Sequence, residues 1–281
     1  MDRNIKRLNI VEENKGYWRV IIHNPPFNNW DPYLFAELNV LMDDMEKNKE
    51  LKVVVFESAN EDFFIDHHDV EHRLEVPDVP GAKPIFHEWP AFVSRLVNLP
   101  VLSISKVRGR AWAQGFEFAL ATDMIFASKE KAKFSLVEVG GNSIPGGGGV
   151  EWLSALCGRA KTLEIVLSAD EYSADLGVQY GFVNRSLPDT ELDEFVDKFA
   201  KRIASFPKRS LYVGKKLVNA HAYAPSEATL FTSNYILHAF DDWQEGKNEY
   251  PKDGKEFEFE KISDIRDLEL NFPAKLGPEE K

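Results

Sequence analysis

The first third of the chain alternates between short apolar runs and a longer segment with helical periodicity. Two strands are predicted at 8–12 and 18–23, separated by a turn that contains glycine. A helix is predicted to begin at Asp31, which suits the N-cap position, because Pro32 follows it and apolar residues then recur at helical spacing. The apolar run 52–56 predicts the next strand. A strand, a helix and a strand in this order indicate a parallel crossover unit and an α/β fold.

Helical patterns become more frequent in the rest of the chain. The polar stretch 58–84 is expected to be irregular. Beyond it we expect a helix at 85–97, a strand at 101–105, a short helix at 114–121, a strand at 124–127 and a helix that begins at 146–149. After residue 159, helices are expected at 160–167, 174–180, 190–205, 208–220 and 226–243. The segment from 245 onward is dense in charge and is expected to be a solvated tail.

Composition narrows the classes of partner. The chain has 281 residues, 43% of them hydrophobic, and a net charge of -12, so it can bury a sizeable core but repels phosphate backbones. We therefore expect no nucleic-acid partner. No apolar run approaches the ~18 residues of a membrane span, and the N-terminus lacks the apolar centre of a signal peptide. The lone cysteine, Cys157, excludes an internal disulfide and suits a reducing compartment, so we expect a cytoplasmic protein.

Two glutamates are the best candidates for catalytic groups. Glu117 lies in the segment 106–123 and Glu138 in the segment 134–150. Each is next to small or glycine-rich backbone, whose N–H groups can come close to a substrate. Two carboxylates divide acid and base roles when their surroundings separate their pKa values. The pair therefore predicts proton transfer at one reacting centre.

Three other patterns have competing interpretations. The histidines between His67 and His72 include the residue types of a zinc site, but they follow no known ligand spacing, so we expect no metal. One of these histidines can instead contact a substrate or act as a base. The glycines at 146–149 lack the Lys-Ser or Lys-Thr of a nucleotide phosphate loop, which favours close backbone packing. Trp112 and Phe116 suit either the core or the wall of an apolar pocket.

Several ordered segments between about 8 and 243 together resemble the crotonase family, the enoyl-CoA hydratase/isomerase superfamily. Residues 63–70 take the place of the first oxyanion loop, 107–123 that of the glycine-rich loop and helix, and 134–149 that of the segment that ends in Ile-Pro-Gly-x-Gly-Gly. The resemblance implies a spiral of ββα units with C-terminal helices that support trimers, often paired as hexamers. It also implies an acyl-CoA thioester substrate and no tightly bound cofactor.

The resemblance also implies roles for single residues. Glu117 and Glu138 match the catalytic glutamates, and the backbone N–H groups of His68 and Gln114 match the two donors of the oxyanion hole. In this scheme Glu138 exchanges the α-proton, while Glu117 positions and activates water. Possible pocket residues are His67, Trp112, Phe116, Gly141 and Pro145. The expected organisation is a spiral core at 1–205, a C-terminal helical region at 206–245 and a charged tail at 246–281.

The chain departs from the family pattern at both oxyanion loops. Asp66–Asp69 replaces a loop of small residues, Ala113–Gly115 replaces three glycines, and no lysine or arginine occurs at 24–29. The main hypothesis is an enzyme that acts on an α,β-unsaturated acyl thioester through an enolate. It would be a hydratase, which belongs to the lyases, or an isomerase. The alternatives are C–C hydrolysis or another specialised step on a carbonyl substrate without CoA, and a non-catalytic scaffold. A homotrimer or a dimer of trimers is expected.

Overall fold

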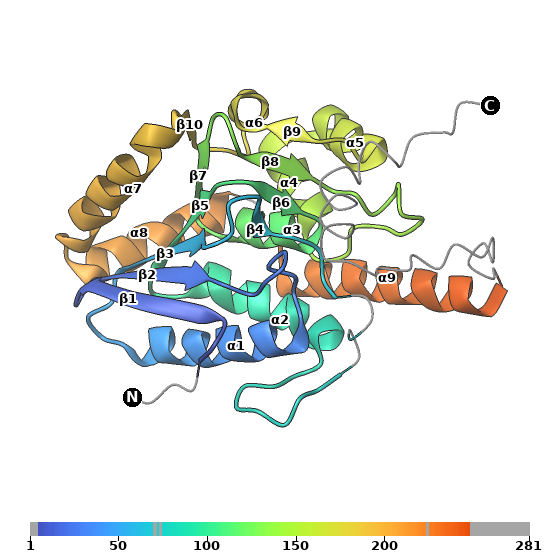
Figure 1. Cartoon of the computed structure of the whole chain (residues 1–281), viewed down its shortest axis with the longest axis horizontal. Coiled ribbons are helices and arrows are strands. Elements are labelled where there is room, and N and C mark those ends of the chain that lie inside the picture. Colours follow the sequence, from blue (N-terminus) through green and yellow to red (C-terminus); the bar gives the residue numbers. More distant parts are fainter. Residues whose placement is uncertain (1–4, 70–71, 73–74, 223–224, 248–281) are drawn as a thin grey trace.

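One layer of the molecule is a six-stranded sheet (Figure 1). The structure is a computed structural model that describes residues 5–69, 72, 75–222 and 225–247. The strands of this sheet, in spatial order, are β1 (Leu8–Asn14), β2 (Tyr17–Ile22), β3 (Val53–Ser58), β5 (Leu102–Val107), β7 (Met124–Ser128) and β10 (Arg185–Leu187). β1 is antiparallel to β2, and the other neighbours are parallel.

The first crossover has the geometry that the sequence predicts. Helix α1 (Pro32–Lys47) connects β2 to β3, and these two strands pair in parallel. Asp31 is the N-cap of the helix, and its side chain accepts a hydrogen bond from the N–H of Leu34 at 2.6 Å. The predicted helix start and the predicted parallel unit are both confirmed.

Helices cover both faces of the sheet (Figure 1). Those after α1 are α2 (Ile85–Asn98), α3 (Gln114–Ala121), α4 (Gly149–Cys157), α5 (Arg159–Ser168), α6 (Ala174–Tyr180), α7 (Asp189–Ala204), α8 (Lys208–His221) and α9 (Glu227–Lys247). They lie within a few residues of the predicted helices. None of the helices in the described ranges is long and apolar enough to cross a membrane. The tail from 248 onward lies outside the described residues, and the predicted domain limits and cytoplasmic location stay predictions.

The large sheet is buried on both faces. Along β3, Val54 and Phe56 pack into the larger core with side chains from α1, α2 and α3, while Val53 and Val55 pack on the opposite face against α7. Successive side chains alternate because a strand has a period of two residues. Burial on both faces explains why this strand is an unbroken apolar run in the sequence.

A second, smaller sheet carries the loops that contain several of the predicted site residues. Its strands, in spatial order, are β4 (Phe63–Ile65), β6 (Arg110–Trp112), β8 (Lys133–Ser135) and β9 (Tyr172–Ser173). β4, β6 and β8 are parallel, and β9 is antiparallel to β8. The expectation that 58–84 is irregular is wrong at β4. Strands of two or three residues are too short to show an alternating pattern, so the sequence predicted none of these four.

Candidate active site

The residues predicted to be functional converge at one edge of the smaller sheet. His68 lies three residues after β4, Gln114 two residues after β6, and Glu138 three residues after β8. Because these three strands are neighbours and parallel, their carboxyl ends meet at the same edge. Ligands of open α/β sheets commonly bind outside the carboxyl ends of the strands. The tertiary structure therefore brings together segments that are far apart in the sequence.

Glu117 is held by the glycine-rich segment that precedes α4. This glutamate on α3 is only 3% exposed, and its Oε1 accepts hydrogen bonds from the backbone N–H groups of Gly147 at 2.8 Å and Gly149 at 3.1 Å. A Cβ at Gly147 would lie 2.1 Å from Oε2 of Glu117 and 2.6 Å from Nε1 of Trp89, so a larger residue here would displace the carboxyl or the indole. Trp89 Nε1 donates to the carbonyl of Gly147 at 2.9 Å and fixes the loop. Close backbone packing, as predicted, is the role of this segment.

The surroundings of Glu117 favour its protonated form. Burial raises the pKa of Glu117 well above its ordinary value, and the negative charge of Glu138 adds to the rise. The N–H groups of Gly149 and Gly147 act in the opposite direction, and the charge of Glu151 raises the pKa further. The carboxyl of Glu117 therefore keeps its proton at a higher pH than an exposed glutamate does.

Glu138 has a different environment. The residue is partly exposed, but its Oε2 is buried and has no hydrogen-bond partner among the described residues. Burial raises the pKa of Glu138 to about 7, while its own backbone N–H and the charge of His67 act to lower it. Each glutamate thus has its own set of neighbours, which is the condition under which two carboxyl groups divide acid and base roles.

Two backbone N–H groups lie at this edge of the sheet. The N–H of Trp30 donates to the carbonyl of His67 at 3.1 Å, and the N–H of Asp69 donates to the carbonyl of Trp30 at 3.0 Å. Since successive residues of an extended segment direct their backbone groups to opposite edges, the N–H of His68 points away from Trp30. Gln114 is the first residue of α3, so its N–H has no carbonyl partner within the helix. An oxyanion hole formed by these two N–H groups stays a prediction.

The start of α3 packs tightly against the end of β4. A Cβ at Gly115 would lie 2.0 Å from the carbonyl oxygen of Ile65 and 2.9 Å from that of Asp66, so this position needs glycine. Ala113, two residues earlier, has φ 45° and ψ −120°, a region that favours glycine. The alanine therefore adopts the required backbone at the expense of local strain.

The predicted pocket residues have different environments. Trp112 and Phe116 are fully buried in apolar clusters. Gly141 is exposed in the turn after Glu138, where its N–H donates to the carbonyl of Val137 at 3.2 Å, and Pro145 is buried. Contact of these residues with a substrate stays a prediction.

His67 lies against a carboxylate that the sequence analysis missed. Its Nδ1 is 2.7 Å from the carbonyl oxygen of His68, and its Nε2 is 3.7 Å from Oδ2 of Asp66, which is fully buried. An acidic residue directly before the histidines was the available signal. His72 pairs instead with Asp69, with 2.7 Å between Nδ1 and Oδ2. Within the described ranges no group of three or more His, Cys, Asp or Glu is arranged to hold a metal ion. That the protein binds no metal stays a prediction.

Known proteins share both the sequence pattern and the fold. A family model described as enoyl-CoA hydratase/isomerase matches residues 12–260. The short-chain-enoyl-CoA hydratase of Clostridium acetobutylicum is 27% identical over 213 residues, which are 75% of this chain and 81% of that protein. The mitochondrial enoyl-CoA hydratase of Pongo abelii is 31% identical over 188 residues, which are 66% of this chain and 63% of that protein.

A solved structure extends the likeness to the whole fold. The crystal structure of a Streptomyces avermitilis protein that is assigned as an enoyl-CoA hydratase superposes with a TM-score of 0.79 at 28% identity, and the match covers 99% of this chain and 98% of that one. The predicted crotonase fold is thereby confirmed. The chain belongs to the enoyl-CoA hydratase/isomerase family.

Proposed function

We propose that the protein catalyses the reversible addition of water to an α,β-unsaturated acyl-CoA thioester. The observation that carries this proposal is the pair of buried carboxyl groups, Glu117 and Glu138, which influence each other's ionisation and have different neighbours. The backbone N–H groups of His68 and Gln114 lie at the same edge of the sheet. Membership of the enoyl-CoA hydratase/isomerase family supports the substrate class.

Each group has a defined part in the proposed reaction. The oxygen of water bonds to the β-carbon, the electrons of the double bond move onto the thioester oxygen, and the resulting enolate then takes a proton at the α-carbon. The N–H groups of His68 and Gln114 stabilise the enolate oxygen, an effect worth about 3 kcal/mol for a single donor in comparable sites. Glu138, with a pKa of about 7, exchanges the α-proton.

Glu117 orients the attacking water in this scheme. Its carboxyl is fixed by the N–H groups of Gly147 and Gly149, so it cannot swing away from the reacting centre. Glu138 delivers one proton to the α-carbon, and the attacking water gives up one proton to the pair of carboxyl groups. The pair therefore returns to its starting state after each turnover.

The decisive experiment is an assay against a panel of 2-enoyl-CoA thioesters of increasing chain length, with the matching free acids and pantetheine esters. We expect loss of the conjugated thioester absorbance and formation of a 3-hydroxyacyl-CoA. Turnover of the free acids or pantetheine esters alone would remove CoA from the proposal. Binding without turnover of any thioester would support a scaffold instead.

A second candidate is different chemistry on a carbonyl substrate, such as C–C hydrolysis of a diketone. The observation that favours it is the first oxyanion loop, where His67 lies beside Asp66. A histidine near a reacting carbonyl can act as a base. Product analysis distinguishes the two, because C–C hydrolysis yields two fragments and hydration yields one product.

We further propose that the protein assembles as a trimer or a dimer of trimers. The helices α8 and α9 expose large apolar side chains in the described region, namely Val213, Leu217, Val218, Phe231, Tyr235 and Ile236. An assembly in which α8 and α9 contact a neighbouring copy would cover these side chains. A measurement of solution mass at micromolar concentration tests the assembly, and a stable monomer of 32.0 kDa contradicts it.

A further inference from the structure

Helix α9 packs directly on the glycine-rich segment that precedes α4. Its residues Leu230, Ser233 and Leu237 recur at a spacing of three and four, which places them on one face of the helix. A Cβ at Gly146 would lie 2.6 Å from Cβ of Leu237. A Cβ at Gly148 would lie 3.0 Å from Cδ2 of Leu230. This face of α9 and the backbone of the segment are therefore in close contact.

The polar member of this face makes a hydrogen bond to α4. The hydroxyl of Ser233 donates to Oε1 of Glu151, which lies in the first turn of α4. Oε2 of Glu151 is buried and has no hydrogen-bond partner among the described residues. A half-buried carboxyl group that loses a donor is left with unpaired acceptors that solvent does not fully compensate. The hydroxyl therefore holds the start of α4 against α9.

The same turn of α4 holds the carboxyl of Glu117. Gly149 is the first residue of α4, two positions before Glu151, and its N–H donates to Oε1 of Glu117 at 3.1 Å. The N–H of Gly147 donates to the same oxygen at 2.8 Å. From α2, which is a neighbour of α9, the indole of Trp89 donates to the carbonyl of Gly147. The donors to Glu117 are therefore held in place by α2 on one side and α9 on the other.

We propose that Ser233 is a positioning residue, which acts through Glu151 to keep the carboxyl of Glu117 in the orientation that directs the attacking water. The inference rests on the role proposed above for Glu117. Catalytic groups must be held within a fraction of an ångström of their productive positions, so a small shift of the first turn of α4 reduces the rate. Helix α9 thus contributes to catalysis through the backbone that it supports.

The test is Ser233→Ala, which removes the hydroxyl and keeps a good helix former. Amide hydrogen exchange followed by NMR reports on the N–H groups of Gly147 and Gly149, because each is protected while it donates to Glu117. We expect both amides to exchange about tenfold faster, as the loss of one such hydrogen bond predicts, while the amides of strand β3 keep their rates. Unchanged rates at both glycines overturn the proposal. Equal acceleration in β3 does so too, since it would indicate a general loss of stability.

Kinetics provide a second readout on any thioester that the protein hydrates. In Ser233→Ala we expect kcat to fall by about tenfold and KM to stay within about twofold, because Glu117 acts on the transition state more than on the bound substrate. A raised KM with unchanged kcat contradicts the proposal, since it would place the hydroxyl in substrate binding. The exchange rates need no substrate. They can therefore fail in an active hydratase and succeed in a protein that hydrates no thioester.

Glu151→Ala breaks the same contact from the other side and covers the case in which Ser233→Ala does not fold. It should also accelerate exchange at Gly147 and Gly149. In this background the further change Ser233→Ala should have no effect, and a full additional acceleration excludes the route through Glu151.

The matched control is Ser94→Ala on α2, which removes a different hydrogen bond to α9. The hydroxyl of Ser94 donates to Oε2 of Glu227 at 3.3 Å on the exposed surface. This variant should leave the exchange of both glycine amides and kcat unchanged. The same acceleration in Ser94→Ala as in Ser233→Ala would show that any loosening of α9 has this effect, and would remove the specific role of Ser233.

Discussion

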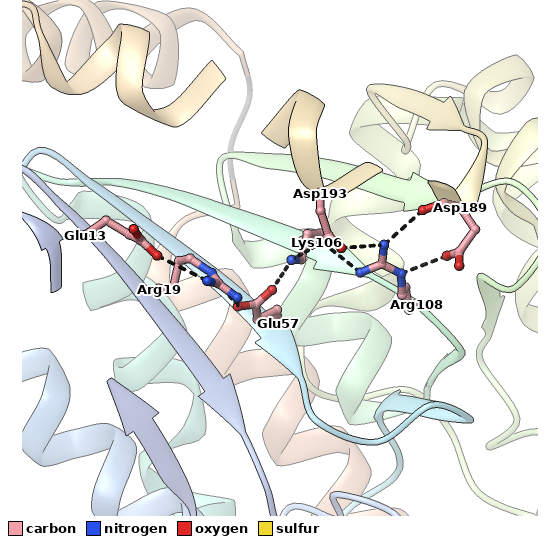
Figure 2. Close-up of polar contacts among 7 residues, drawn as sticks. All are labelled: Glu13, Arg19, Glu57, Lys106, Arg108, Asp189 and Asp193. Atoms are coloured by element: carbon pink, nitrogen blue, oxygen red, sulfur yellow. Dashed lines mark hydrogen bonds and ion pairs between the residues drawn. The ribbon is translucent and has the colours of Figure 1, made fainter. Parts of the chain in front are cut away.

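The protein gathers carboxylates in two regions, and one of them supplies strong cations. On the face of the large sheet that α7 covers, Glu57 on β3 contacts Lys106 on β5, and Lys106 also contacts Asp193 on α7 at 2.6 Å (Figure 2). We call these ion pairs the outer network. Arg108 joins Asp193 to Asp189, with 2.9 Å and 2.7 Å between the nitrogen and oxygen atoms. Each carboxylate of this network meets a lysine or an arginine, and the network ties α7 to the sheet.

The pKa values of the two regions diverge accordingly. Burial acts to raise the pKa of Asp193, but hydrogen bonds from Arg108 and Lys106 outweigh it and bring the pKa down to about 2. At the candidate site burial prevails, and the pKa of Glu138 rises to about 7. The comparison indicates that charge is compensated where it joins elements of the fold, and left largely uncompensated at the candidate site. Perturbed carboxyl groups in such surroundings are good candidates for catalysis.

The largest expected effect comes from neutralising the site. Glu117→Gln and Glu138→Gln should each lower turnover of a 2-enoyl-CoA by at least about 100-fold, as expected for general acid–base groups. Glutamine keeps an oxygen that can accept from Gly147 and Gly149, so the fold of the Glu117 variant should persist. Steady-state kinetics and circular dichroism check the two statements. Near-normal turnover in a folded variant removes that residue from the mechanism.

Breaking the outer network should change stability and leave chemistry intact. Lys106→Met keeps the apolar stem but removes the buried ammonium that Glu57 and Asp193 share, and we expect the free energy of unfolding to fall by about 2 kcal/mol. Urea denaturation measures the loss, and kcat should be unchanged.

The control is Lys129→Met, which removes an exposed ion pair with Asp175 at 3.4 Å and should change stability by less than about 1 kcal/mol. A large loss of turnover in Lys106→Met without loss of stability contradicts the division between the two regions.

The same division predicts that Glu138 destabilises the fold increasingly as pH rises from about 4.5 to above 7. Its pKa is raised from 4.5 to about 7, so the folded protein bears a growing penalty as pH rises through this range and the carboxyl ionises in the buried site. Glu138→Gln should therefore raise the free energy of unfolding by about 3 kcal/mol at pH 8, at about 1.4 kcal/mol for each unit of pKa shift, and by little near pH 4. Denaturation at both pH values tests this. Glu61→Gln, at an exposed glutamate, should show no such dependence.

The smallest expected effect concerns the strained backbone at the start of α3. Ala113→Gly should raise the free energy of unfolding by about 1 kcal/mol, because glycine tolerates φ 45° without strain and this gain exceeds the loss of one buried methyl group. Ala111→Gly, in strand β6, should instead lower stability. Thermal or urea unfolding of the two variants compares them directly. A destabilised Ala113→Gly protein shows that the apolar contacts of the methyl group outweigh the strain.

The sequence by itself determined the elements that depend on local pattern. Helix α3 was predicted at 114–121, where the structure has it, because its apolar residues recur within one continuous segment. Asp31 and Pro32 located the start of α1 through capping chemistry alone. The glutamate pair and the family also followed from residues in order along the chain, and the family is confirmed.

Only the tertiary structure decided the environment of the site. The strands β4, β6 and β8 are too short to be predicted, yet their parallel pairing sets the loops that follow them at one edge of the sheet. The contact of Gly147 with Glu117 likewise joins residues 30 positions apart. Nothing local in the sequence shows that Asp66 is fully buried beside an imidazole. Helices follow from neighbours along the chain, whereas burial and charge depend on groups that only folding brings together, and it is burial and charge that determine which carboxyl group holds a proton.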